Sequence, residues 1–172
     1  MNTKLMFSSK NEKFSTPQYI FNTLNREFNF TLDPCCEFYT RKVMDNYYTA
    51  ETNGLDKSWE GETVFMNPPY GRQDTGIWIK KAYEESLKPN TTVVALIPSR
   101  TDTRFWHDYC MNSSEIRFIK GRLKFGDSKD AAPFPSCVVI MNGDNSCKVS
   151  TMENIKPTPL IQFDSNLINI TC

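Results

Sequence analysis

Several residue types and sequence patterns that form common functional sites are scarce or absent in this 172-residue chain. It has one histidine, and its six cysteines form no Cys-x-x-Cys pair, so we expect no metal site. No apolar run approaches the roughly 20 residues of a transmembrane helix, and residues 1–11 lack the apolar stretch of a signal peptide. We therefore expect a cytoplasmic protein with reduced thiols and no membrane contact.

The chain also lacks an excess of either charge. Lys+Arg and Asp+Glu each number 20, so the formal net charge is zero. This balance excludes a globally basic nucleic-acid binder, but it leaves room for a local basic surface. The length suits one domain with one substantial core.

Hydrophobic spacing predicts short strands alternating with helices. A helix is expected over 17–28 with Thr16 as its N-cap, a second around Trp78, Ala82 and Leu87, and a third over 103–111. Strands are expected at 30–33, 46–49, 63–66, 92–97, 115–119 and 137–141. This alternation indicates an α/β fold with a mostly parallel sheet and helices on both faces. We expect the domain to span 1–143, with 144–172 as an appendage or edge strand.

The motif Asn67-Pro68-Pro69-Tyr70 follows the predicted strand 63–66 directly. Ligands bind outside the carboxyl ends of parallel strands, which is where this motif falls. Two consecutive prolines fix φ near about −65° and remove two backbone donors, so the loop is rigid and offers mainly acceptors. A plain turn is the alternative, but the position favours a site for an amino group.

The chemistry that suits this loop is methylation of an amino group conjugated to an aromatic ring. The Asn67 side-chain oxygen and the Pro68 carbonyl would accept the two amine hydrogens, and these bonds strengthen as positive charge develops on nitrogen. Tyr70 would stack on the ring. Asn67, Pro68, Pro69 and Tyr70 are therefore the predicted catalytic residues, and the mechanism requires no covalent nucleophile.

Further motifs in the same order resemble one enzyme family. They are Thr16-Pro17, Leu32-Asp33-Pro34, Gly54-Leu55 through Trp59, and Gly121-Arg122-Leu123-Lys124-Phe125 followed by Pro133-Phe134-Pro135-Ser136. With Asn67 to Tyr70, and over roughly residues 14–143, the chain resembles the small phage-type DNA adenine-N6 methyltransferases of the Dam family. The resemblance implies a Rossmann-like methyltransferase sheet, S-adenosyl-L-methionine as cofactor, DNA as partner, and extrusion of the target adenine from the duplex.

The resemblance also implies where the cofactor binds. The loop after the first strand would surround the methionine part, an acidic residue after the second strand would hold the ribose, and two residues further on would face the adenine ring. The implied cofactor residues are Thr16, Pro17, Asp33, Pro34, Cys36, Glu51, Asn53, Leu55 and Asn67. Asp45 is the second candidate for the ribose. An Asx turn is the structural alternative for Asp33.

Basic side chains near the predicted strand ends are candidates for binding DNA phosphates. They are Arg72, Arg100, Arg104, Arg122 and Lys124, of which the last two belong to a basic run over 117–129. Surface ion pairs and a solvated face are the alternatives. The three tryptophans are expected in the core or at its rim, and His107 is expected to be structural rather than a general base.

Other functions remain open from the residues alone. The same Asn-Pro-Pro-Tyr loop occurs in enzymes that methylate an RNA base, cytosine N4 or a protein amide. A catalytically silent nucleic-acid-binding domain is the alternative from a different class. The flanking motifs favour site-specific methylation of adenine N6 in DNA.

Overall fold

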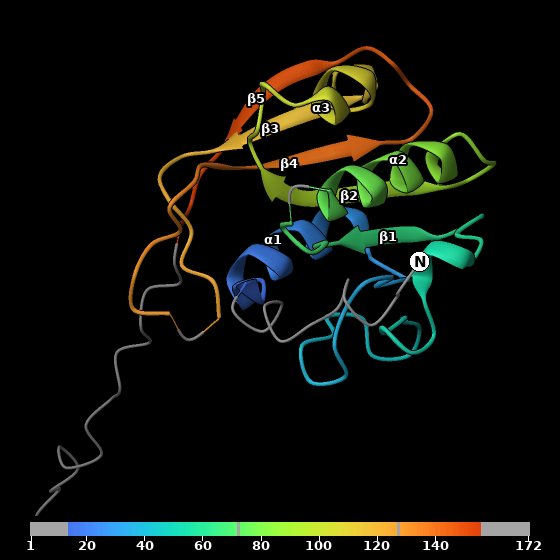
Figure 1. Ribbon diagram of the computed structural model, residues 1–172, viewed down its shortest axis with the longest axis horizontal. Helices are drawn as coiled ribbons and strands as arrows, with labels where there is room; N and C mark the ends of the chain where they lie inside the picture. Colours follow the sequence, from blue (N-terminus) through green and yellow to red (C-terminus); the bar gives the residue numbers. More distant parts are fainter. Residues whose placement is uncertain (1–13, 72, 127, 156–172) are drawn as a thin grey trace, which may run out of the picture.

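The computed structural model describes residues 14–71, 73–126 and 128–155, and its centre is a five-stranded sheet (Figure 1). The strands, in the spatial order β1-β2-β4-β3-β5, are β1 Thr63–Met66, β2 Thr92–Pro98, β4 Ser136–Met141, β3 Glu115–Ile119 and β5 Lys148–Met152. The pairs β1–β2 and β3–β5 are parallel, and β4 is antiparallel to both of its neighbours. Four strands therefore share one direction, as predicted, while the reversed β4 makes the sheet mixed.

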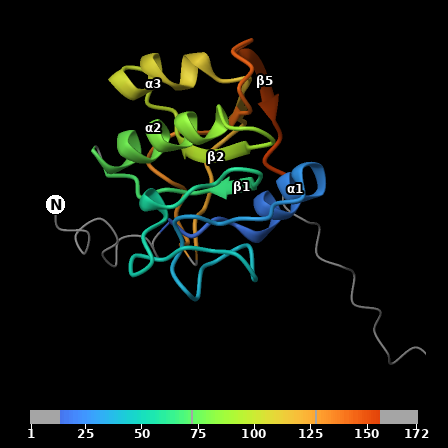
Figure 2. The ribbon, with the colours of Figure 1, turned by 90° about the vertical axis from the view of Figure 1, so that its right-hand side faces the viewer.

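Helices cover both faces of the sheet, which confirms that prediction (Figure 2). Helix α1 spans Gln18–Phe28, α2 spans Asp74–Ser86 and α3 spans Arg104–Asp108. Side chains alternate along β2, since Val93 and Ala95 pack in the cluster of α2 and α3, whereas Val94 and Leu96 pack in the cluster of α1. The polar loops at the carboxyl ends of β1 and β2 are thereby held between two packed layers.

The two strands predicted before β1 are much shorter than expected. Leu32 forms one parallel bridge to Val64, and Asp33 forms one parallel bridge to Tyr47. Pro34 has no N–H to continue the ladder, so pairing stops at the bridge. The two short segments nevertheless extend the sheet beyond β1 and place Asp33 at its carboxyl edge.

Helix boundaries differ from the predictions in three places. Thr16 is not the N-cap, because that position belongs to Pro17 and α1 begins at Gln18 without a side-chain cap. The helix expected over 103–111 ends at Asp108, and a separate 3-10 turn follows over Cys110–Asn112. Leu87 follows α2 and is exposed, so the buried face of this helix ends before it.

Strand β5 lies within the segment 144–172 and pairs with β3, as the edge-strand alternative predicted. The division of the chain at residue 143 stays a prediction.

Trp59, Trp78 and Trp106 are buried, which confirms their place in the core, and His107 is exposed. Within the described residues, no helix is long and apolar enough to cross a membrane.

Candidate active site

The loop after β1 is held in one shape by its own side chains and by α2. The Asn67 amide nitrogen donates to the Phe14 carbonyl at 2.9 Å, and the Asn67 Oδ1 accepts from the Tyr70 hydroxyl at 2.6 Å. The Thr75 hydroxyl, at the start of α2, donates to the Pro69 carbonyl at 2.9 Å. The Asn67 amide is thus oriented with its oxygen toward Tyr70, and that carbonyl oxygen keeps a second lone pair.

Tyr70 is enclosed by aromatic rings. Its ring centroid lies 5.3 Å from that of Phe14, 5.7 Å from Phe125 and 5.5 Å from Phe134. The Leu96 carbonyl oxygen lies 3.3 Å from the Tyr70 hydroxyl and shares its single proton with the nearer Asn67 Oδ1. Burial raises the pKa of the Tyr70 phenol well above its ordinary value, so this hydroxyl stays protonated and acts as a hydrogen-bond donor.

Asp33 presents a buried carboxylate at the same edge of the sheet. Its Oδ2 accepts from the backbone N–H of Lys42 at 2.9 Å. Burial raises the pKa of Asp33 to about 6, although backbone hydrogen bonds from Lys42 and Cys35 lower it in part. The contact with Cys35, two residues on, is that of an Asx turn, whereas the contact with Lys42 ties Asp33 to a distant part of the loop.

One cavity brings the two predicted groups together. It is lined by Asn67, Pro68 and Tyr70 from the loop after β1 and also by Asp33 and Thr16. Cys36 lines it as well. The Thr16 hydroxyl is buried and has no hydrogen-bond partner among the described residues. Buried polar groups are nearly always hydrogen-bonded, so an unpaired hydroxyl on a residue that lines a cavity is a candidate for binding a polar ligand.

A second cavity, of about 560 Å³, shares Glu37 with the first. Glu51, the first candidate for the ribose, lines it together with Phe38 and Tyr47. Asp45 is exposed and lines neither of these two cavities. Sequence reasoning did not identify Glu37, because only the fold shows that the turn after Cys36 lies against both cavities.

Four other predicted cofactor residues do not line these two cavities. The Asn53 amide donates to Asp56 at 2.5 Å, and Leu55 packs against the core beneath α2. Pro17 and Pro34 have mainly backbone roles. The Pro17 carbonyl accepts the first N–H bonds of α1, and the Pro34 carbonyl lies against Gly54.

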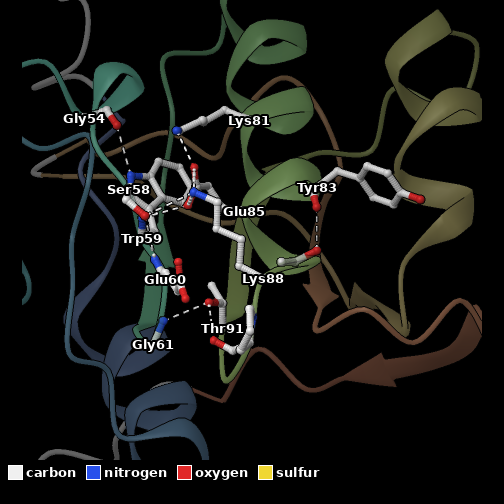
Figure 3. A network of polar contacts seen from close by, with 12 residues as sticks. Gly54, Ser58, Trp59, Glu60, Gly61, Lys81, Tyr83, Glu85, Lys88 and Thr91 are labelled. Atoms are coloured by element: carbon white, nitrogen blue, oxygen red, sulfur yellow. Dashed lines mark hydrogen bonds and ion pairs between the residues drawn. The ribbon is translucent and has the colours of Figure 1, made fainter.

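A buried ion-pair network anchors the segment that follows the second cavity (Figure 3). The Glu85 carboxylate, 3% exposed, accepts the Trp59 backbone N–H at 2.7 Å and pairs with Lys81 and Lys88. The Trp59 indole N–H donates to the Gly54 carbonyl at 3.0 Å. This chain of contacts fixes the position of Gly54, and sequence reasoning did not single out Glu85.

Gly54 is expected to be essential to the loop that carries Asp33. A Cβ at Gly54 would lie 2.1 Å from the Pro34 carbonyl oxygen, so Gly54→Ala must displace that backbone. We expect the variant to lose at least about tenfold in methyl-donor affinity, a fall measurable by calorimetry. Gly76→Ala is the matched control, because its Cβ meets Phe105 at an ordinary 3.5 Å. Equal donor affinity in both variants would contradict the role of Gly54.

The candidate DNA-binding residues fall into two groups. Arg100 donates to the Tyr70 carbonyl at 3.2 Å, and Arg104 pairs with Asp108 at 3.0 Å, and both line a groove of about 1160 Å³ between α2 and α3. Arg122 and Lys124 lie in the loop after β3. Arg72 lies outside the described residues.

Part of the basic run over 117–129 is neutralised by ion pairs. Arg117 pairs with Glu27 at 2.7 Å and with Glu115 at 2.9 Å, and Lys120 pairs with Glu153 at 3.3 Å. Arg122 and Lys124 instead donate to backbone carbonyls and are exposed. Lys124 immediately precedes Phe125, whose ring contacts Tyr70, so this end of the run lies beside the loop after β1.

Comparison with known proteins agrees with these motifs. The family model described as DNA N-6-adenine-methyltransferase (Dam) matches residues 3–162. The DNA N-6-adenine-methyltransferase of Haemophilus phage HP1 (strain HP1c1) is 32% identical over 166 residues, which cover 95% of this chain and 83% of the relative. That of Escherichia phage T1 is 31% identical over 112 residues, which cover 64% of this chain and 45% of the relative. Because the family match spans nearly all of the sequence, the chain belongs to the DNA N-6-adenine-methyltransferase (Dam) family.

Proposed function

We propose that the chain transfers a methyl group from S-adenosyl-L-methionine to the exocyclic N6 of adenine in DNA, within a Rossmann-like methyltransferase fold. Family membership supports the substrate and the reaction. The observation that carries the site is the cavity that joins Asn67, Pro68 and Tyr70 to Asp33 and Thr16. Methyl transfer needs the amine and the donor in contact, and both sets of residues face this one space.

The residues on the donor side fit S-adenosyl-L-methionine. The unpaired Thr16 hydroxyl and the buried Asp33 carboxylate suit the charged amino acid end, since a cation there would offset the desolvation of Asp33. The adjoining cavity offers Glu51 for the ribose hydroxyls and the Phe38 and Tyr47 rings for the adenine. When bound, the cofactor supplies an electrophilic methyl group.

The catalytic loop activates and orients the target amine. The free lone pair of the Asn67 Oδ1 and the Pro68 carbonyl accept its two hydrogens, which directs the nitrogen lone pair toward the donor. These acceptors interact more strongly as nitrogen becomes positive, so they lower the barrier. The Tyr70 hydroxyl, held protonated by burial, keeps the Asn67 amide from rotating.

A transfer assay tests the proposal and separates it from its alternatives. The chain is incubated with S-adenosyl-L-methionine labelled on its methyl group and, in separate reactions, with unmethylated DNA, RNA or protein. We expect label in DNA alone, recovered as N6-methyladenine after digestion to nucleosides. Label recovered as N4-methylcytosine, or in RNA or protein only, would contradict the proposed substrate. DNA binding without any transfer would support the catalytically silent alternative.

Lys124 is expected to contact a DNA phosphate beside the site. Each such contact adds about 0.9 to the slope of log affinity against log salt, so Lys124→Gln should reduce the slope by about one unit. Lys148→Gln is the matched control, because Lys148 is exposed at the amino end of β5, the opposite edge of the sheet. Titrations of one duplex at several salt concentrations measure both slopes. An unchanged slope for Lys124→Gln would mean that the residue only faces solvent.

A further inference from the structure

The ring of Phe14 covers the catalytic tyrosine in the structure. The two ring planes are inclined by 43° with centroids 5.3 Å apart. Phe125 and Phe134 meet the Tyr70 ring edge-on, at 79° and 87°. Among these three described neighbours, Phe14 is therefore the ring nearest to a stacked arrangement on Tyr70.

The backbone around Phe14 is held by the loop after β1 and by the loop after β3. The Phe14 carbonyl accepts from the Asn67 side-chain amide at 2.9 Å, and the Ser15 carbonyl accepts from the Gly126 N–H at 2.8 Å. The next residue, Thr16, lines the cavity, and its buried hydroxyl has no partner among the described residues. The backbone of segment 14–16 is thus held by the Asn67 side chain on one side and by Gly126 on the other, and Thr16 brings the segment to the cavity shared with Asp33.

The space in front of the catalytic loop is too small for the target base. The cavity lined by Phe14, Asn67 and Tyr70 has a volume of about 30 Å³, which holds one or two water molecules. A purine is several times larger, so a wall of the cavity has to move when adenine binds. The loop wall is rigid because of its two prolines and the Thr75 bond, and Phe65, the other phenylalanine that lines the cavity, is 1% exposed in the core. Phe14, which is only partly buried, is the wall that can shift.

We propose that the extruded adenine binds between Tyr70 and Phe14, so that Phe14 is a second base-binding residue. This inference rests on the proposed function, which places the target amine at Asn67. Bases stack about 3.4 Å apart, so a base between two rings requires a centroid separation of about 7 Å. The Phe14 ring therefore moves outward by roughly 1.5 Å from its present 5.3 Å and loses its tilt.

This arrangement gives Phe14 two effects on the reaction. Its ring buries the second face of the base, which holds the adenine in the extruded position. Its backbone carbonyl accepts from the Asn67 side-chain nitrogen and so keeps the Asn67 amide in the orientation that accepts the N6 hydrogens. Phe14 therefore contributes both to binding the extruded adenine and to orienting the Asn67 oxygen that accepts the N6 hydrogens.

The test compares two duplexes that differ only in the target base. The methylated sequence is mapped first by sequencing N6-methyladenine in DNA from cells that express the chain, and a second duplex carries an abasic site at that adenine. We expect Phe14→Leu to weaken binding of the intact duplex by about 5- to 150-fold, the range for one lost base stack. Binding of the abasic duplex should change less than about twofold, since no base is present to stack.

Controls separate stacking from folding. Phe14→Trp should retain affinity for the intact duplex, because it keeps a flat aromatic face. Phe28→Leu removes an aromatic ring from the far end of α1, where Phe28 packs on Phe30, and should affect neither duplex. Donor affinity should be unchanged in Phe14→Leu.

Two results would overturn the role of Phe14 while leaving the proposed function intact. Equal losses on both duplexes would show that Phe14 acts only through the fold, and tighter binding of the intact duplex by Phe14→Leu would show that the ring merely blocks the site. A wild-type chain that transfers no methyl group to DNA would overturn the proposed function and the role of Phe14 with it.

Discussion

Alanine in place of Asn67 is expected to lower the rate of DNA methylation by about 10²- to 10³-fold, the usual loss for one transition-state hydrogen bond. The Asn67 Oδ1 already accepts from Tyr70, and its remaining lone pair is the group we assign to the target amine. The bond to the amine strengthens only as charge develops on nitrogen, so kcat should fall far more than the affinity for DNA. Single-turnover transfer of labelled methyl groups measures the effect.

The variant should remain folded and should still bind the methyl donor. Asn67→Ala removes two hydrogen bonds, the one to the Phe14 carbonyl and the one from the Tyr70 hydroxyl, a loss of about 2 kcal/mol in the free energy of unfolding. Donor affinity should stay within a few fold of the parent value. Asn112→Ala is the matched control, since Asn112 is exposed and its side-chain amide, like that of Asn67, donates to a backbone carbonyl, here that of Asp108. Activity near the parent level in Asn67→Ala would remove Asn67 from the mechanism.

Local patterns predicted the strands of the sheet because each strand is specified by its own residues. The expected ranges 63–66 and 115–119 coincide with β1 and β3, and 92–97 and 137–141 fall one residue short of β2 and β4. Val and Ile runs bounded by turn residues favour strands regardless of their neighbours. Antiparallel β4 was not predicted, because the direction of a strand depends on how the chain returns to the sheet.

Contacts between residues that lie far apart in the sequence could not be predicted from the sequence alone. From the sequence, Glu85 is one more charged residue of a helix. It becomes buried and bonds to the Trp59 N–H only when α2 packs on the sheet with Trp78 stacked on Trp59. Phe14 likewise precedes α1 by a few residues and gives no periodic signal, yet its ring lies on Tyr70. The motif residues Asp33 and Asn67 were identified because strand-end positions share one edge of a parallel sheet.

Asparagine in place of Asp33 is expected to abolish methyl-donor binding and to stabilise the free protein at neutral pH. The carboxylate is buried, and burial raises its pKa to about 6 in the folded state, against about 3.9 in an unfolded chain. The folded state therefore binds this proton more tightly, so the pKa difference makes folding less favourable above pH 6. One pKa unit corresponds to about 1.4 kcal/mol, so the cost at pH 7 reaches roughly 3 kcal/mol.

The neutral amide removes this cost while keeping an oxygen that can accept the Lys42 N–H. Asp33→Asn should therefore raise the free energy of unfolding at pH 7 to 8 by up to roughly 3 kcal/mol, and its advantage should shrink as the pH falls through 6 toward 4, where the parent carboxylate is protonated. Urea unfolding at several pH values measures this profile. Donor affinity should fall by at least about 30-fold at pH 7, because the cationic end of the ligand loses its buried counter-charge.

Asp45→Asn is the matched control, because Asp45 is exposed and lines neither of the two cavities. It should change neither donor affinity nor the pH profile. In the parent protein, donor affinity should itself weaken below about pH 6, since a protonated Asp33 no longer attracts a cation. A destabilised Asp33→Asn that still binds the donor normally would show that the carboxylate serves the loop rather than the ligand. A stabilised variant without donor affinity would show instead that the buried charge is maintained for binding, at the expense of folding stability.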